Sequence, residues 1–135
     1  HGTLDDANSS DVVVFGSGPA TRYKCRDPGY LQNFKLDPGH QLIASMCSGA
    51  LILAALGLLE KVEATTYPTA VSELESFGVT VVQRPFVHAG NIATAAGCLA
   101  AVDLVSWIIE KKAGSSASDA VLASISPVGA AAEGK

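Results

Sequence analysis

Apolar runs alternate with turn-rich segments along the chain, and their lengths predict strands and helices in turn. Residues 11–18, DVVVFGSG, form a β-branched run that stops at glycines, and residues 41–46 form a second short apolar run. Continuous runs of this kind are typical of strands buried on both faces, as in a parallel sheet. The segment between them is rich in turns, with room for a short helix at residues 30–34.

The rest of the chain continues this alternation. The further predicted elements are a helix over 49–59, a strand over 62–68, a helix over 70–78, strands over 79–87 and 91–97 around a turn at 89–91, and helices over 98–112 and 119–125. The helix over 98–112 has the clearest spacing, because apolar residues recur on one face. That spacing places Cys98 on the core side of the helix.

Strands that alternate with helices predict an α/β fold, a three-layer sandwich around a mostly parallel sheet. A chain of 135 residues has room for one domain, predicted to span residues 1–128, with a flexible tail at residues 129–135. Reactive groups in such sheets gather beyond the carboxyl ends of the strands. Both FGSG (15–18) and MCSG (46–49) lie at predicted strand ends, so a site is expected there.

Composition narrows the classes of function. Hydrophobic residues make up 48% and charged residues 16%, with a net charge of −4 and no basic run, which argues against binding to nucleic acid or an anionic membrane. No apolar stretch approaches the length of a membrane span. Cys25, Cys47 and Cys98 are widely spaced and odd in number, so neither a disulfide framework nor a metal site is predicted. We expect a reducing, cytoplasmic setting and no cofactor.

Cys47 stands at the predicted corner between a strand and a helix. A side chain on such a turn projects above the sheet beside free helix N–H groups, which favour an anion and hence the nucleophilic thiolate. Gly49 lets the helix begin close to the strand, as glycine does in a nucleophile elbow. The alternative interpretation is packing, since most free cysteines are buried and inert. We favour packing for Cys25 and Cys98 and leave both interpretations open for Cys47.

Two backbone donors could stabilise negative charge that develops after attack by Cys47. The amide of Ser48 follows the thiol directly, and the turn Gly16-Ser17-Gly18 ends the neighbouring strand. Together they would form an oxyanion hole. Gly16, Gly18 and Tyr67 are the candidate substrate-binding residues, and Tyr23 and Phe86 are further candidates to line a pocket.

The segments SMCSGALILAALGLLEKVEATTYP and GNIATAAGCLAAVDLVSWII resemble the ThiJ/PfpI superfamily, which shares its flavodoxin-like sandwich with class I glutamine amidotransferase domains. The isonitrile hydratase-like proteins are the most similar subgroup. DDANSSDVVVFGSG is similar to that group's aspartate-hydrophobic strand and Pro-Gly-Gly turn. The resemblance covers about residues 3 to 114. It implies that Cys47 is the nucleophile, that Ser48 is the hydroxyl residue after it, and that Ser17 contributes an oxyanion-hole amide.

The sequence departs from the family in its proton-transfer residues. Where relatives carry Thr-His-Trp, this chain has Thr66-Tyr67-Pro68, and no histidine follows Cys47 directly. His88 is the only histidine downstream of Cys47, and we interpret it as a surface residue at a strand end. Asp5, Asp6 and Asp11 precede the first strand and are expected to be solvated.

A third departure concerns an opening strand and helix of the family, which supply an acidic residue near the thiol and are absent here. A sheet without an inner strand would leave backbone groups unpaired and apolar surface exposed. We therefore expect a partner, either a second polypeptide that supplies this strand and its acidic residue or a homodimer mate. The fold would then be completed by another chain.

Three hypotheses for the function follow. The first is a cysteine-dependent enzyme, a lyase that adds water to an isonitrile through a Cys47 thioimidate. The second is a thiol amidase or hydrolase of the same fold, which needs a proton shuttle near neutral pH. The third is a ligand- or redox-sensing domain of a transcriptional regulator, because accessible thiolates oxidise readily. In each case the expected ligand is a small molecule.

Overall fold

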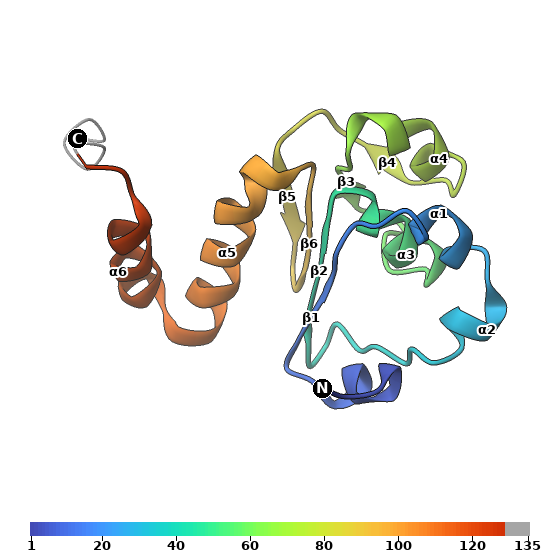
Figure 1. The fold of residues 1–135 in the computed structure, drawn as a ribbon, viewed down its shortest axis with the longest axis horizontal. Coiled ribbons are helices and arrows are strands. Elements are labelled where there is room, and N and C mark those ends of the chain that lie inside the picture. Colours follow the sequence, from blue (N-terminus) through green and yellow to red (C-terminus); the bar gives the residue numbers. More distant parts are fainter. Residues whose placement is uncertain (129–135) are drawn as a thin grey trace.

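The computed structural model describes residues 1–128, so the tail expected at 129–135 lies outside the described residues. The main sheet has four strands in the order β1-β2-β6-β5 (Figure 1). They are β1 (Val12–Phe15), β2 (Leu42–Met46), β5 (Phe86–Ala89) and β6 (Ile92–Ala95). Strands β1, β2 and β6 are parallel, and β5 is antiparallel to β6. The prediction of an α/β fold with a mostly parallel sheet is confirmed.

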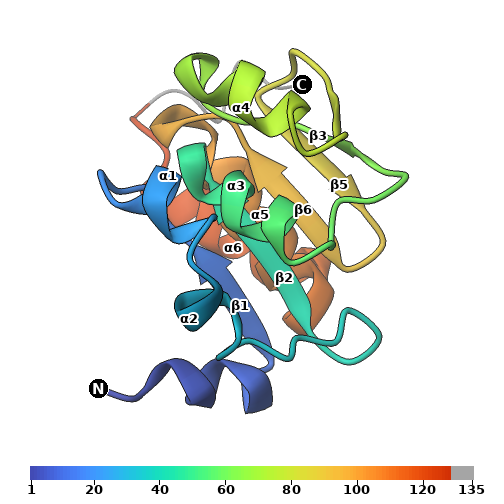
Figure 2. The same ribbon diagram turned by 90° about the vertical axis from the view of Figure 1, so that its right-hand side faces the viewer.

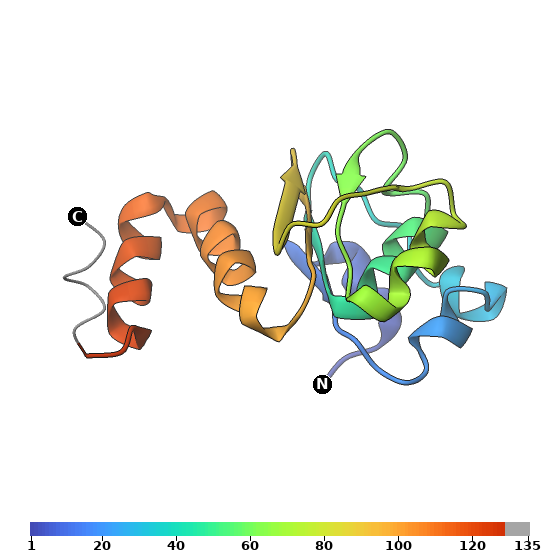
Figure 3. The ribbon, with the colours of Figure 1, turned by 90° about the horizontal axis from the view of Figure 1, so that it is seen from above.

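Helices cover both faces of this sheet and so make the outer layers of the sandwich (Figures 1 and 2). One face carries α1 (Thr21–Lys24), α2 (Pro28–Leu31) and α3 (Ala50–Ala55), and the other carries α5 (Ala101–Ala113). The last helix, α6 (Ser115–Ile125), lies against α5 on the side away from the sheet (Figure 3). β1 leads into α1, and β2 leads into α3, so the carboxyl ends of both strands lie close to the starts of these helices.

Local capping decides where the short helices begin. The Asp27 carboxylate accepts hydrogen bonds from the amides of Gly29 and Tyr30, and Pro28 occupies the first helical position. Both features are strong start signals. They place α2 two residues earlier than the helix expected at 30–34. At the other end of the chain, the η1 turn (Leu4–Ser9) precedes β1.

A second, two-stranded sheet corrects two predictions. β3 (Glu63–Ala64) pairs in parallel with β4 (Thr80–Val81), and the η3 turn (Pro68–Ala70) and α4 (Val71–Glu75) connect them. The strand expected over 62–68 is shorter because the residues after Ala64 bond to the main sheet and its corner instead. The strand expected over 79–87 is divided between two sheets, with Pro85, which has no N–H to donate, just before β5.

Two apolar clusters hold the layers together, one on each face of the sheet. Ile43, Leu51 and Leu53 are fully buried on the α3 side, whereas Leu104 and Trp107 of α5 are buried on the other side. The core therefore lies directly beneath the carboxyl ends of β1 and β2.

The first strand is an edge strand, and its burial pattern differs from that of β2. Val13 and Phe15 face the α3-side cluster, but Val14 is 45% exposed. Every residue of β2 from Leu42 to Ser45 is buried. A parallel strand normally has both faces covered, but within residues 1–128 one face of β1 is open at Val14, and β1 is paired on one edge only.

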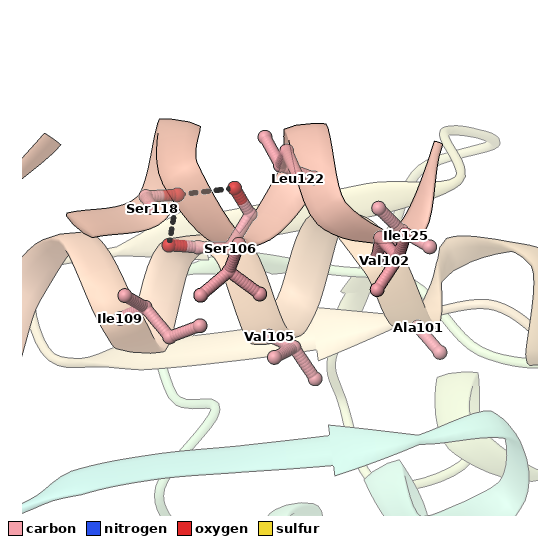
Figure 4. A pocket seen from close by; sticks show the side chains of 9 residues that line it. Ala101, Val102, Val105, Ser106, Ile109, Ser118, Leu122 and Ile125 are labelled. Atoms are coloured by element: carbon pink, nitrogen blue, oxygen red, sulfur yellow. Dashed lines mark hydrogen bonds between the residues drawn. The ribbon is translucent and has the colours of Figure 1, made fainter. Parts of the chain in front are cut away.

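The face that α5 presents to the sheet also differs from the prediction. Its buried residues are Leu104 and Trp107, while Val102 and Val105 of the expected apolar stripe are about half exposed. Those two valines line an apolar groove of about 170 Å³ between α5 and α6 (Figure 4). The hydroxyl groups of Ser106 and Ser118 meet across this groove at 2.7 Å. None of the helices in the described part of the chain has the length and hydropathy to cross a membrane.

Candidate functional site

The corner between β2 and α3 has unusual backbone geometry at its cysteine. β2 ends at Met46, and the η2 turn (Cys47–Gly49) leads directly into α3. Cys47 has a φ angle of +56°, in the left-handed region that residues with a side chain rarely adopt. Such strain persists only where the surrounding structure enforces it, and it is frequent at functional sites. Cys47 is partly exposed, so its thiol is not sealed in the core.

Gly49 fixes this corner against the neighbouring strand. A Cβ atom at Gly49 would stand 2.1 Å from the carbonyl oxygen of Phe15 and 3.0 Å from that of Gly16. No side chain can occupy that space, because real Cβ contacts are longer than 3.0 Å. The predicted role of Gly49, a close approach of helix to strand, is what the geometry requires.

Thr66 holds the corner from the opposite side, and sequence reasoning did not assign it a role. Its hydroxyl donates a hydrogen bond of 2.8 Å to the carbonyl oxygen of Cys47, and its side chain is buried. Just before it, the amide of Thr65 donates to the hydroxyl of Thr94 in β6 at 2.9 Å. The two buried threonines thus anchor the end of β3 to both the main sheet and the Cys47 corner. The sequence ATT after β3 was the available signal.

The two backbone donors predicted for an oxyanion hole lie on the turns that follow β1 and β2. Ser48 is buried within the η2 turn, while Ser17 is exposed in the turn after β1. The amide of Gly18 donates to the Thr21 hydroxyl at 3.1 Å. Within residues 1–128 the Ser17 amide has no protein acceptor. In this turn of the described chain, the Gly18 amide is therefore occupied, whereas the Ser17 amide is not.

Two hollows flank the corner, and the candidate substrate-binding residues divide between them. Gly16 and Gly18 line a hollow of about 440 Å³ along β1. Tyr67 lines a separate hollow of about 960 Å³, together with Thr66. Cys47 lines neither, but Thr66, which bonds its carbonyl oxygen, lines the larger one, and Phe15 and Gly16, which Gly49 approaches, line the other. The structure therefore does not gather Gly16, Gly18 and Tyr67 in one cavity.

The other aromatic candidates lie away from the corner. Tyr23 is exposed on α1, and Phe86 lies on β5, two strands from β2. His88, on the same strand, is exposed and stacks beside Phe86 and Trp107 at ring-centroid distances of 5.7 and 6.1 Å. This arrangement agrees with a surface position for His88 and gives it no contact with Cys47.

The acidic residues before β1 have local roles. Asp6 accepts hydrogen bonds from the amide and hydroxyl of Thr3, and Asp5 accepts from Asn8. Within residues 1–128, no carboxylate or histidine forms a hydrogen bond to the sulfur of Cys47. The same residues contain no cluster of side chains that could hold a metal ion. Within residues 1–128 the corner thus combines a partly exposed thiol with nearby backbone amides, and no carboxylate or histidine is bonded to the sulfur.

The two remaining cysteines differ from one another. Cys25 is buried and its sulfur donates to the carbonyl of Arg22 at 3.3 Å. Burial, reinforced by the nearby Glu73 carboxylate, raises the pKa of the Cys25 thiol above its ordinary value. Cys98 is exposed, so its predicted place on the core side of a helix is wrong. It begins the η4 turn (Cys98–Ala100), which precedes the regular α-helix and does not follow its spacing.

Comparison with known proteins places this fold and corner in a family. The profile of the DJ-1/PfpI family matches residues 3–111. The chain belongs to the DJ-1/PfpI family. Isonitrile hydratase from Pseudomonas putida is 26% identical over 113 residues, which are 83% of this chain and 50% of that protein. The chain therefore spans about half the length of this curated relative.

Solved structures of the DJ-1/PfpI family agree with the fold. A THiJ/PfpI family protein from Pseudomonas syringae superposes with a TM-score of 0.75 at 25% identity, over 87% of this chain and 50% of that one. Schizosaccharomyces pombe DJ-1 superposes with a TM-score of 0.74 at 23% identity, over 93% of this chain and 68% of that one. The DJ-1/PfpI fold is thus shared by proteins that are longer than the chain described here.

Proposed function

We propose that this chain is the nucleophile-bearing part of a cysteine-dependent enzyme that adds water to isonitriles. The observation that carries the proposal is the partly exposed Cys47 at φ +56°, at the carboxyl end of a buried parallel strand. The similarity to isonitrile hydratase supports this choice of substrate class. A thiol held in this way can form a covalent intermediate, which divides a difficult addition into two easier steps.

The proposed reaction has two stages. The Cys47 thiolate bonds to the terminal carbon of the isonitrile, and a proton delivered to that carbon gives a thioimidate. Water then adds to the thioimidate carbon, and the carbon–sulfur bond breaks to return the thiolate and release an N-substituted formamide. The amides of Ser17 and Ser48 would stabilise negative charge that develops during these steps. The overall stoichiometry is one isonitrile and one water to one formamide.

The proton donor is proposed to come from another polypeptide segment that pairs with β1. Within residues 1–128, β1 is paired on one edge only and Val14 is 45% exposed; the hollow beside the strand is lined by Leu4 and Phe34 together with polar residues such as Ser17. A strand added in parallel to β1 would end at the same edge of the sheet as Gly16 and Cys47. A carboxylate at that end would supply the acid or base that residues 1–128 do not place at the sulfur.

Turnover of phenyl isonitrile tests the proposed function. We expect the chain to form N-phenylformamide, which is measured by NMR. The variants Cys47→Ala and Cys47→Ser should form none. The assay is run on the chain alone and after addition of the part of Pseudomonas putida isonitrile hydratase that this chain does not match. Turnover retained in Cys47→Ala would contradict the proposal. So would the absence of both formamide and a thioimidate mass adduct under both conditions.

An amidase or hydrolase is the less favoured function. Acyl transfer to water needs a group that both accepts and returns a proton near neutral pH. The one histidine downstream of Cys47 lies on β5, stacked against Trp107. Hydrolysis of an anilide substrate without turnover of the isonitrile would reverse this preference.

A further inference from the structure

Cys47 and Cys98 leave the sheet at the same edge from neighbouring strands. β2 and β6 are parallel, and Met46 is paired with Ala95. Adjacent strands are about 4.8 Å apart, so the segments that follow β2 and β6 leave the sheet side by side. Cys47 follows Met46 directly, and Cys98 comes three residues after Ala95. The sheet register therefore brings two thiols that are far apart in sequence to one end of the fold.

Two consecutive residues, Thr66 and Tyr67, contact the segments that carry the two cysteines. The Thr66 hydroxyl contacts the carbonyl oxygen of Cys47 at 2.8 Å. Next in the chain, the Tyr67 ring lies 3.8 Å from the Cβ position of Gly97, which precedes Cys98. Thr66, Tyr67 and Cys98 all line the same hollow of about 960 Å³. The contacts through two consecutive residues place Cys98 at the rim of the hollow that adjoins the Cys47 corner.

Cys98 is free to approach that corner. It is exposed at the start of the three-residue η4 turn, and Leu99 beside it is 99% exposed, so the Cys98 side chain can change rotamer while buried Ala100 anchors the turn. Cys25 offers a contrast, because it is buried on the α1 side under the first apolar cluster. Among the three thiols, Cys98 is exposed and Cys47 is partly exposed, and both lie at the end of the sheet where β2 and β6 end.

We propose that Cys47 and Cys98 form a reversible redox pair, with Cys98 as the resolving thiol. A hydroperoxide such as hydrogen peroxide is the oxidant. The Cys47 thiolate attacks one peroxide oxygen, the O–O bond breaks, and hydroxide leaves with Cys47 as a sulfenic acid. The Cys98 thiol then loses its proton and its sulfur attacks the Cys47 sulfur; the S–O bond breaks, the displaced hydroxide combines with that proton to give water, and a disulfide forms. This step prevents further oxidation to the sulfinic acid and blocks the nucleophile until a thiol reductant restores it.

Peptide mapping after peroxide treatment tests the redox pair. In the oxidised full-length chain we expect a mass loss of about 2 Da and a disulfide between the tryptic peptides spanning residues 36–61 and 62–111, reversed by dithiothreitol. Cys98→Ser should lose this cross-link and gain oxygen on Cys47. Cys25→Ser is the matched control and should form the cross-link as the unaltered chain does.

The proposal rests on the Cys47 thiolate but not on the isonitrile chemistry, so the two can fail separately. A cross-link that contains Cys25, a cross-link between two chains, or oxygenated Cys47 beside free Cys98 in the unaltered chain would each overturn the redox pair. Phenyl isonitrile turnover by the reduced, unaltered protein is measured independently. If the protein forms the Cys47–Cys98 cross-link but does not turn over phenyl isonitrile, only the proposed function is contradicted.

Discussion

The backbone of Gly49 lies against the carbonyl oxygen of Phe15 so closely that a Cβ atom there would stand 2.1 Å away. This contact joins the carboxyl ends of β1 and β2, because Phe15 ends one strand and Gly49 closes the turn after the other. Cys47 lies two residues before Gly49 in the same turn and has a left-handed φ. The position of the thiol is therefore fixed by the contact of this turn with the end of β1 as well as by its own backbone conformation.

Replacing Gly49 with alanine should destabilise the corner. The added methyl group has no room beside a backbone oxygen that cannot rotate away, so the free energy of unfolding should fall by roughly 1–3 kcal/mol, as overpacking of a core does. Chemical denaturation followed by circular dichroism measures this change. Gly16→Ala is the control, since nothing lies within 4 Å of its Cβ position. Equal stability of Gly49→Ala and the unaltered chain would contradict the contact.

The Thr66 hydroxyl should matter more than the bulk of its side chain. Thr66→Val keeps the shape but leaves the Cys47 carbonyl without its donor, which should cost about 1–3 kcal/mol of stability. Thr66→Ser restores the hydroxyl and should recover most of that loss. Thermal unfolding compares the two variants, and alkylation of Cys47 by iodoacetamide reports on the corner itself. A valine variant with unchanged stability and alkylation rate would exclude this role.

Alkylation of Cys25 should be slow and dependent on pH. Burial and Glu73 raise the pKa of its thiol, so the reactive thiolate is scarce until the pH exceeds the ordinary value near 9.0. The folded state holds this proton more tightly than the unfolded state. The contribution to stability is therefore complete below about pH 9 and is lost as the pH rises through the raised pKa.

Peptide mapping of alkylation between pH 7 and 10 checks the prediction for Cys25. Glu73→Gln should speed labelling of Cys25, because the carboxylate that disfavours its thiolate is removed. Glu75→Gln, on an exposed side chain of the same helix, is the control and should have no effect. Labelling of Cys25 as fast as that of exposed Cys98 would show that the thiol is not shielded.

The corner at Cys47 could be predicted because its signals are local. An apolar run, a cysteine and a nearby glycine follow one another within ten residues, and the strand, turn and helix appear in that order. The helix is shorter than expected, since α3 ends at Ala55 and a turn with Gly57 at φ +76° follows it. The strands of the main sheet were likewise predictable, β1 from its β-branched run and the others from short apolar runs bounded by turn residues.

Features that depend on strand order were not predictable. The bond from Thr66 to Cys47 and the contact of Gly49 with Phe15 exist because separate segments meet at one edge of the sheet. Cys98 was placed on the core side because a regular helix was assumed from its first residue. The actual first turn is a 3-10 turn, in which the helical spacing does not hold.

The uncovered side of β1 leads to the last prediction, which concerns association. Val14→Lys should change the stability of the isolated chain by no more than about 0.5 kcal/mol, since Val14 is 45% exposed and touches little. The same change should abolish pairing of a further strand with β1, because it places a charge on the otherwise apolar edge strand VVVF, and charged side chains on an edge oppose strand addition. The probe is the part of Pseudomonas putida isonitrile hydratase that this chain does not match, added to purified protein.

Sedimentation gives the mass of the complex, and amide hydrogen exchange locates it. A one-to-one complex with slowed exchange at residues 12–15, lost in Val14→Lys and kept in Val121→Lys on α6, is the expected result. If the amides of residues 12–15 exchange slowly without the probe, and the mass rises to that of a dimer as the protein concentration increases, a second copy of the chain covers β1 instead. A monomer whose β1 amides exchange rapidly with and without the probe would contradict the proposal, because the sheet would then be stable with that edge open.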